Sequence, residues 1–266
     1  MRVQPLTVND NVERLLVVSD LHGFREPLDV LDGIFKACEG ESVIVSTGDY
    51  VLIGVSPVYT VEWVMENSGE FALAGNHDRN VVERVEGEHP PYTEAGASQL
   101  LSEEQRQYLG NLPDILELSW RDKIIRITHC LTPMGECFSW RATTAEVFDA
   151  VVDTSVDLTV TAHTHCPFVR KNERGFVANC GATSGLMLAH KLKDGSIQSK
   201  TDVPFEPVSE IYSTYLVVTL DDGEVNATVE HFDFDREKEF KLLEDAGYDN
   251  LERIREWLTT GVLLTD

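Results

Sequence analysis

The sequence predicts an α/β fold in which neighbouring parallel strands present polar residues along one edge of a sheet. Two observations predict it. Over roughly the first 80 residues, short apolar runs alternate with segments of helical periodicity, an order typical of parallel strands joined by crossover helices. Each apolar run also ends in an acid, a histidine or both. Because the carboxyl ends of parallel strands meet at one edge, we expect these polar ends to lie together.

The first strand is expected over residues 15–18, where four apolar residues suit a strand buried on both faces. It is followed by Asp20, His22 and Gly23. In extended chain, residues two apart point the same way, so Asp20 and His22 can reach one point beyond the strand. This is how oxygen and nitrogen ligands are presented to a divalent metal. For one such pair alone, a polar strand end with a helix cap is the more frequent explanation.

The next elements continue the alternation. Apolar residues at helical spacing predict amphipathic helices over 25–38 and 57–67, the second with Pro57 in its first turn. Apolar runs predict strands over 42–49 and 71–78. These strands end in further polar residues, namely Asp49, Asn76, His77 and Asp78.

The rest of the chain is richer in strands. A helix is expected over 101–113, where Ser102 and Gln105 have the spacing of a capping box. The segments 115–120 and 123–129 predict a hairpin that ends in His129. The other expected elements are a helix over 141–152, a strand over 158–162 that runs into His163 and His165, a strand over 176–181, a hairpin around 193–195, paired strands over 215–220 and 225–232, and a helical region over 240–258 on the outside.

The polar strand ends form a set that suits two metal ions. Five of the eight histidines stand at such ends, which ordinary burial of single histidines does not explain well. The candidate ligands are Asp20, His22, Asp49, Asn76, His129, His163 and His165. Seven ligands exceed what one tetrahedral zinc accepts but suit two ions that share a bridge, for which Asp49 has two oxygens. Two such cations bind a phosphoryl group and activate water.

This ordered series resembles the signature of the calcineurin-like metallophosphoesterases over about residues 15–185. The text GDYVLIG and the acid Asp78 after His77 resemble the small prokaryotic phosphodiesterase branch more than the protein phosphatases. The resemblance implies a four-layer αββα sandwich, two mixed β-sheets flanked by helices, with a dinuclear centre. It further implies that His77 is unliganded, acts on the leaving oxygen and is oriented by Asp78. The implied ligands are Asp20, His22, Asp49 and His165 for the first metal, and Asp49, Asn76, His129 and His163 for the second.

Composition limits the partners. The 46 acidic and 22 basic residues give a net charge of −24, which disfavours extended nucleic acid and leaves a small phosphoester substrate acceptable near a metal. Adaptation to a salt-rich cytoplasm is an alternative explanation of that charge. No apolar run reaches the length of a membrane span, and the first residues lack a signal-peptide pattern. Five scattered cysteines contain no Cys-x-x-Cys pair, so we expect reduced thiols and a cytoplasmic protein.

The expected organisation is a single domain over 1–266 with a helical appendage at 233–266, and association into homo-oligomers is left open. The expected function is phosphoester hydrolysis, with phosphodiesters favoured, using two divalent ions from among Mn, Fe, Zn and Ni. The alternatives are a phosphomonoesterase, a nucleotide pyrophosphohydrolase or a non-catalytic scaffold, and the complete ligand set argues against the scaffold. In the loop after His129, one hypothesis is that Phe138, Trp140 and Arg141 line the pocket mouth. The alternative is that Trp140 packs in the core while Arg141 caps or neutralises an otherwise acidic surface.

Overall fold

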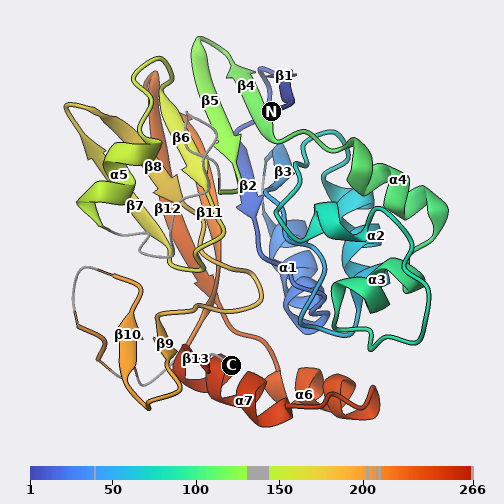
Figure 1. Cartoon of the computed structure of the whole chain (residues 1–266). Coiled ribbons are helices and arrows are strands. Elements are labelled where there is room, and N and C mark those ends of the chain that lie inside the picture. Colours follow the sequence, from blue (N-terminus) through green and yellow to red (C-terminus); the bar gives the residue numbers. More distant parts are fainter. Residues whose placement is uncertain (39, 131–143, 202–203, 207, 209–210, 265–266) are drawn as a thin grey trace.

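The computed structural model describes residues 1–38, 40–130, 144–201, 204–206, 208 and 211–264. Two mixed sheets lie at its centre (Figure 1). The first has the order β12 (Glu224–Phe232), β11 (Ser213–Asp221), β2 (Arg14–Val18) and β3 (Ser42–Ser46). The second has the order β1 (Val3–Val8), β4 (Ile115–Trp120), β5 (Lys123–Thr128), β6 (Leu158–Thr161), β8 (Gly175–Asn179) and β7 (Phe168–Asn172).

Strand β2 explains why its sequence is continuously apolar. Leu15 and Val17 belong to the core between the two sheets, while Leu16 and Val18 point to the opposite face. There they pack beneath helices α1 (Glu26–Ala37) and α2 (Pro57–Asn67). Burial on both faces removes the polar alternation that marks a half-exposed strand. The parallel pairing of β2 with β3 confirms the order predicted for these two strands.

A fourth layer covers the outer face of the second sheet. Helix α5 (Ala145–Val151) packs Val147, Phe148 and Val151 against Val177 of β8. In Figure 1, α5 lies on one side of the sheets, and α1 and α2 lie on the other. The predicted αββα sandwich is confirmed. The predicted helix over 141–152 is observed from Ala145, and residues 141–143 fall outside the described part of the chain.

The carboxy-terminal segment, residues 236–264, forms two helices and a strand. Helices α6 (Arg236–Asp245) and α7 (Leu251–Thr260) bury Phe240 and Trp257 in a cluster with Phe24 and Met187. Strand β13 (Val262–Leu264) then joins β9 (Ala189–Lys191), which pairs with β10 (Ile197–Ser199) as the predicted hairpin. The helices therefore face inward, onto the loop that follows β2, and they lie at one end of the sandwich (Figure 1).

The predicted strand over 71–78 is wrong as a regular element. Only one parallel bridge joins Ala72 to Ser46 of β3. Beyond it the chain leaves the sheet because its amides find other acceptors: Ala74 N–H donates to the carbonyl of Pro113, and Gly75 N–H donates to the carboxylate of Asp78. A short 3₁₀ turn, η1 (Asp78–Val81), follows.

Strands β1, β7 and β13 and helix α3 (Glu94–Leu100) have weak sequence signals and were not predicted. Strand β1 contains Pro5, which an edge strand tolerates because its amide side need not be paired. Strand β7 is the opposite edge of the same sheet, and α3 is a short helix. Helix α4 (Glu103–Asn111) confirms the capping box of Ser102 and Gln105. No helix among the described residues has the length and apolar character needed to span a membrane.

Candidate metal centre

Three candidate ligands converge from the ends of β2 and β6. Nε2 of His22 lies 3.0 Å from Nε2 of His165, and Oδ1 of Asp20 lies 3.2 Å from the same His165 atom. The three residues are at most 4% exposed. Their ligand atoms all lie within 4.8 Å of one another, a spacing that one cation can bridge. We call Asp20, His22 and His165 the first group.

A second group gathers Asp49, His129 and His163, which follow β3, β5 and β6. Oδ2 of Asp49 lies 3.2 Å from Nε2 of His129. Oδ1 of Asn76 lies 3.2 Å from the same nitrogen, and the ring centroids of His129 and His163 are 5.3 Å apart. His163 and Asn76 are only half-buried, so this group is the more accessible of the two.

The ligands converge through turned backbone and not through the extended chain that we expected. Asp20 donates its amide to the carbonyl of Gly48, and His22 donates to the carbonyl of Asp49, so the loops after β2 and β3 run side by side. This pairing requires the chain to turn at each ligand. Five ligands have left-handed φ angles: Asp20 52°, His22 48°, Asp49 57°, His163 69° and His165 56°.

Two glycines allow the loops to meet. A Cβ atom on Gly75 would lie 2.1 Å from Oδ1 of Asp49, and one on Gly48 would lie 2.3 Å from the amide nitrogen of Gly75. Both distances are too short for any side chain. The Gly48-Asp49 and Gly75-Asn76 pairs are therefore needed for close backbone approach.

The donor set of the first group fits a divalent cation. Oδ1 of Asp20 is buried and has no hydrogen-bond donor among the described residues, although two imidazole nitrogens lie nearby. Nδ1 of His22 lies 3.3 Å from the carbonyl of Val51, which leaves Nε2 to face the centre. Burial, together with His165, lowers the pKa of His22 to about 3, so its ring is neutral. A cation would satisfy these inward lone pairs.

His129 has the same kind of support in the second group. Its Nδ1 lies 2.8 Å from the carbonyl of Thr47, so Nε2 faces Asp49. Burial lowers the pKa of His129, but the carboxylate of Asp49 raises it, and the result is about 10. The imidazole thus holds a proton where a metal would otherwise bind, and metal binding would displace that proton.

His77 lies at the rim, and its partner differs from the one expected. Its Nδ1 is 2.9 Å from Oε1 of Glu94, the first residue of α3, and its Nε2 is 4.0 Å from Oδ2 of Asp49. The expectation that Asp78 orients His77 is wrong. The Asp78 carboxylate is buried and accepts the amides of Asp49, Tyr50 and Gly75 at 2.8, 2.9 and 2.8 Å, so it ties the ligand loops together.

Sequence reasoning missed two further residues at the centre. Glu94 carries no local signal beyond its place after the N-cap Thr93, because its contact with His77 spans 17 residues. Trp257 belongs to the apolar face of α7, and its ring centroid lies 5.7 Å from that of His165. Phe138, Trp140 and Arg141 fall outside the described residues.

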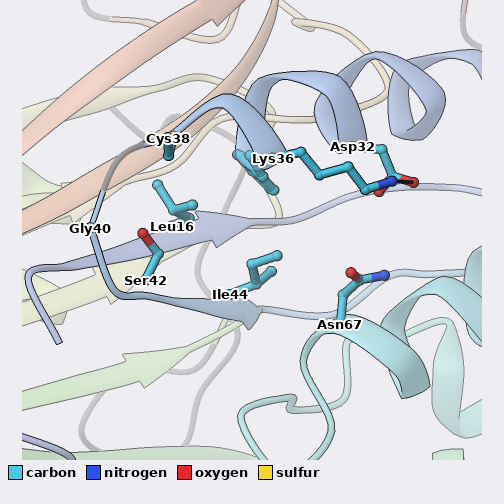
Figure 2. A pocket seen from close by; sticks show the side chains of 9 residues that line it. Leu16, Asp32, Lys36, Cys38, Gly40, Ser42, Ile44 and Asn67 are labelled. Carbon is cyan, nitrogen blue, oxygen red and sulfur yellow. Dashed lines mark ion pairs between the residues drawn. The ribbon is translucent and has the colours of Figure 1, made fainter. Parts of the chain in front are cut away.

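Two hollows differ in their relation to the centre. One of about 250 Å³ adjoins the second group, with Asn76, His129 and the Arg79–Asp114 ion pair in its wall. The other, of about 270 Å³, lies between α1 and the starts of β2 and β3, away from the ligands. Figure 2 shows it lined by Leu16, Ile44 and the Asp32–Lys36 ion pair.

Comparisons with known proteins identify a family model and structures of similar fold. The family model of the calcineurin-like phosphoesterases matches residues 13–167. A metallophosphoesterase from Sphaerobacter thermophilus has a similar fold, with a TM-score of 0.66 and 20% identity over 91% of this chain and 97% of that one. A hypothetical protein from Pyrococcus horikoshii has a TM-score of 0.65 and 15% identity, over 93% of this chain and 98% of that one. A candidate diadenosine tetraphosphatase has a TM-score of 0.51 and 16% identity, over 86% of this chain and 97% of that one. No curated protein has a significant sequence match.

Proposed function

Because the chain belongs to the calcineurin-like phosphoesterase family and brings together two groups of candidate metal ligands, we propose that it cleaves phosphodiesters at a dinuclear metal centre. One observation carries the proposal. Two groups of carboxylate and imidazole side chains come together at the ends of four strands, and His77, which belongs to neither group, stands beside them. This arrangement provides for two cations and one proton donor.

The first group, Asp20, His22 and His165, would hold one ion. His129, His163 and Asn76 would hold the other, and Asp49 would bridge the two. When bound, such ions supply positive charge to a phosphoryl group and lower the pKa of water. The mixture of carboxylate, amide and imidazole donors favours Mn, Fe, Zn or Ni over Mg or Ca.

His77 would donate a proton to the leaving oxygen. Its Nδ1 is held by Glu94, and Nε2 lies toward the shared carboxylate of Asp49. Glu94 would fix both the tautomer and the orientation of the ring, since a carboxylate next to Nδ1 keeps the proton of that atom in place. Asp78, which the resemblance implied would orient His77, would instead hold the ligand loops together.

The substrate class is the finer part of the proposal. A small diester fits the more accessible second group and its adjoining hollow, whose wall includes the Arg79–Asp114 ion pair. A nucleotide pyrophosphohydrolase is the main alternative, since one protein of similar fold is named as a candidate diadenosine tetraphosphatase. A phosphomonoesterase would use the same ligands.

Metal loading followed by a substrate panel tests the proposal. The protein is loaded with each of the four metals and assayed on bis-p-nitrophenyl phosphate, p-nitrophenyl phosphate and a dinucleoside tetraphosphate. We expect two ions per chain and the fastest turnover on the diester. Asp49→Asn should lose both metal and activity, whereas Asp122→Asn in the exposed β4–β5 turn should not. Two bound ions without hydrolysis of any substrate would indicate a scaffold.

A further inference from the structure

The buried Trp257 of α7 contacts the first group directly. Its ring centroid lies 5.7 Å from that of His165, with the planes at 45°. On another side it meets Phe24 edge-on, with centroids 5.9 Å apart. Phe24 stands two residues after His22 in the loop that leaves β2. One side chain from the end of the chain thus touches one ligand and the loop that carries the other two.

A hydrogen bond extends this contact to Asp20. The indole N–H of Trp257 donates to the carbonyl of Leu186 at 2.9 Å. The same segment donates the amide of Ser184 to the carbonyl of Asp20 at 3.2 Å and the amide of Met187 to the carbonyl of His165 at 3.1 Å. Movement of the indole would therefore shift the backbone that holds both residues.

The carboxy-terminal segment is anchored around this contact. Oε2 of Glu239 accepts the amides of Arg25 and Glu26 at 3.0 and 2.9 Å, where α1 begins. The ring of Tyr248 stacks on Tyr92, just before α3, with centroids 4.1 Å apart. These contacts fix α6 and α7 on the same loops that carry the candidate site.

We propose that Trp257 is a positioning residue for the first metal site, and that the carboxy-terminal segment forms one wall of the centre. The proposal rests on the dinuclear centre of the proposed function. The segment lies outside residues 13–167, which match the family model, so this wall belongs to the rest of the chain. It accounts for the asymmetry of burial, because the first group is at most 4% exposed while His163 is half-buried.

Metal titration of Trp257 variants tests this role. Calorimetric titration of the metal-free protein with Mn²⁺ gives the affinity of each site, and the visible spectrum of the Co²⁺ form reports ligand geometry. Trp257→Leu should lower the affinity of one site by about 10- to 100-fold, the usual effect of losing a group that orients a ligand. The second site should keep its affinity. Trp257→Phe retains a ring against His165 and should recover part of the loss.

Trp63 provides a matched control. It is a tryptophan of similar burial on α2, 4% exposed, and its indole N–H donates to Asp32 at 2.7 Å instead of to a loop of the centre. Trp63→Leu should lower the melting temperature while leaving both Mn²⁺ affinities and the Co²⁺ spectrum unchanged.

The outcomes separate this inference from the function on which it rests. Native affinity at both sites in Trp257→Leu would overturn the positioning role, and so would equal loss at both sites accompanied by a lower melting temperature. A native chain that binds fewer than two ions would instead overturn the dinuclear centre. Two ions bound by the native chain and by an unaffected Trp257→Leu variant would overturn the positioning role and the wall, and leave the dinuclear centre standing.

Discussion

Backbone conformation distinguishes the candidate ligands from the rest of the chain at the residue scale. Nine non-glycine residues of the described ranges have left-handed φ angles, and five of them are candidate ligands. That conformation costs roughly 1–2 kcal/mol per residue. This conformation persists because hydrogen bonds between the ligand loops, and others to the buried carboxylate of Asp78, fix the path of the backbone. Strain concentrated in this way is typical of a functional site.

His77 and Glu94 lead to a prediction at the same scale. His77→Ala should keep both metals and lose about 10²- to 10⁴-fold in kcat, the range of a positioned proton donor. The loss should be smaller for nitrophenyl esters, whose leaving group needs no proton. Glu94→Gln should reduce kcat less than His77→Ala, because the amide still contacts Nδ1 at its present 2.9 Å distance but carries no charge.

Steady-state kinetics on paired substrates with good and poor leaving groups check this assignment. Glu104→Gln is the control, since Glu104 is exposed on the neighbouring helix α4. Equal losses on both substrates for His77→Ala would contradict proton donation and make His77 a residue that orients the substrate.

Contacts between elements hold the carboxy-terminal helices on the sandwich. The carboxylate of Glu239 on α6 accepts the two amides at the start of α1, where helix amides lack partners within the helix. Its other oxygen is buried without a hydrogen-bond partner among the described residues. Glu239 therefore couples the docking of α6 to its own protonation state.

The pH dependence of stability should reveal this coupling. Burial raises the pKa of Glu239 from 4.5 to about 7, with Glu26 and Asp29 adding to the rise, while the amides of Glu26 and Arg25 lower it. Lys238 lies nearby and pairs with Glu26. Because the folded state then holds a proton that the unfolded state releases, the contribution is full below pH 4.5 and is lost as pH rises through about 7.

Urea unfolding of the native chain and Glu239→Gln across this range measures the effect. The free energy of unfolding of the native chain should fall more steeply with pH than that of the variant, by about 3 kcal/mol in total. Glu237→Gln on the exposed side of the same helix is the control. Parallel pH profiles for the native chain and Glu239→Gln would contradict the assignment.

The net charge of −24 acts on the molecule as a whole. Mutual repulsion of surface carboxylates destabilises a compact state, and salt weakens this repulsion. The melting temperature should therefore rise between about 0.01 and 0.1 M KCl, where the screening length falls from about 30 to 10 Å. NaCl should act equally, because screening depends on ionic strength. A flat or falling melting temperature would show that opposite charges already balance locally.

Local signals in the sequence were enough to predict the central strands β2, β3 and β6 and the candidate ligands that follow them. Continuous apolar runs identify β2, β3 and β6 because burial on both faces leaves only apolar residues. Their polar ends follow directly, so the histidines and acids at the centre could be named from position alone. The sequence signal for the hairpin turn at Asp222-Gly223 is also local, and both residues have the positive φ that the turn requires.

Only the tertiary structure decided how those residues meet and what surrounds them. The left-handed turns at the ligands depend on hydrogen bonds between separate loops, which no local pattern encodes. Glu94 and Trp257 reach His77 and His165 across 17 and 92 residues of chain. Such contacts depend on how helices pack, whereas periodicity reports only which face of an element is buried.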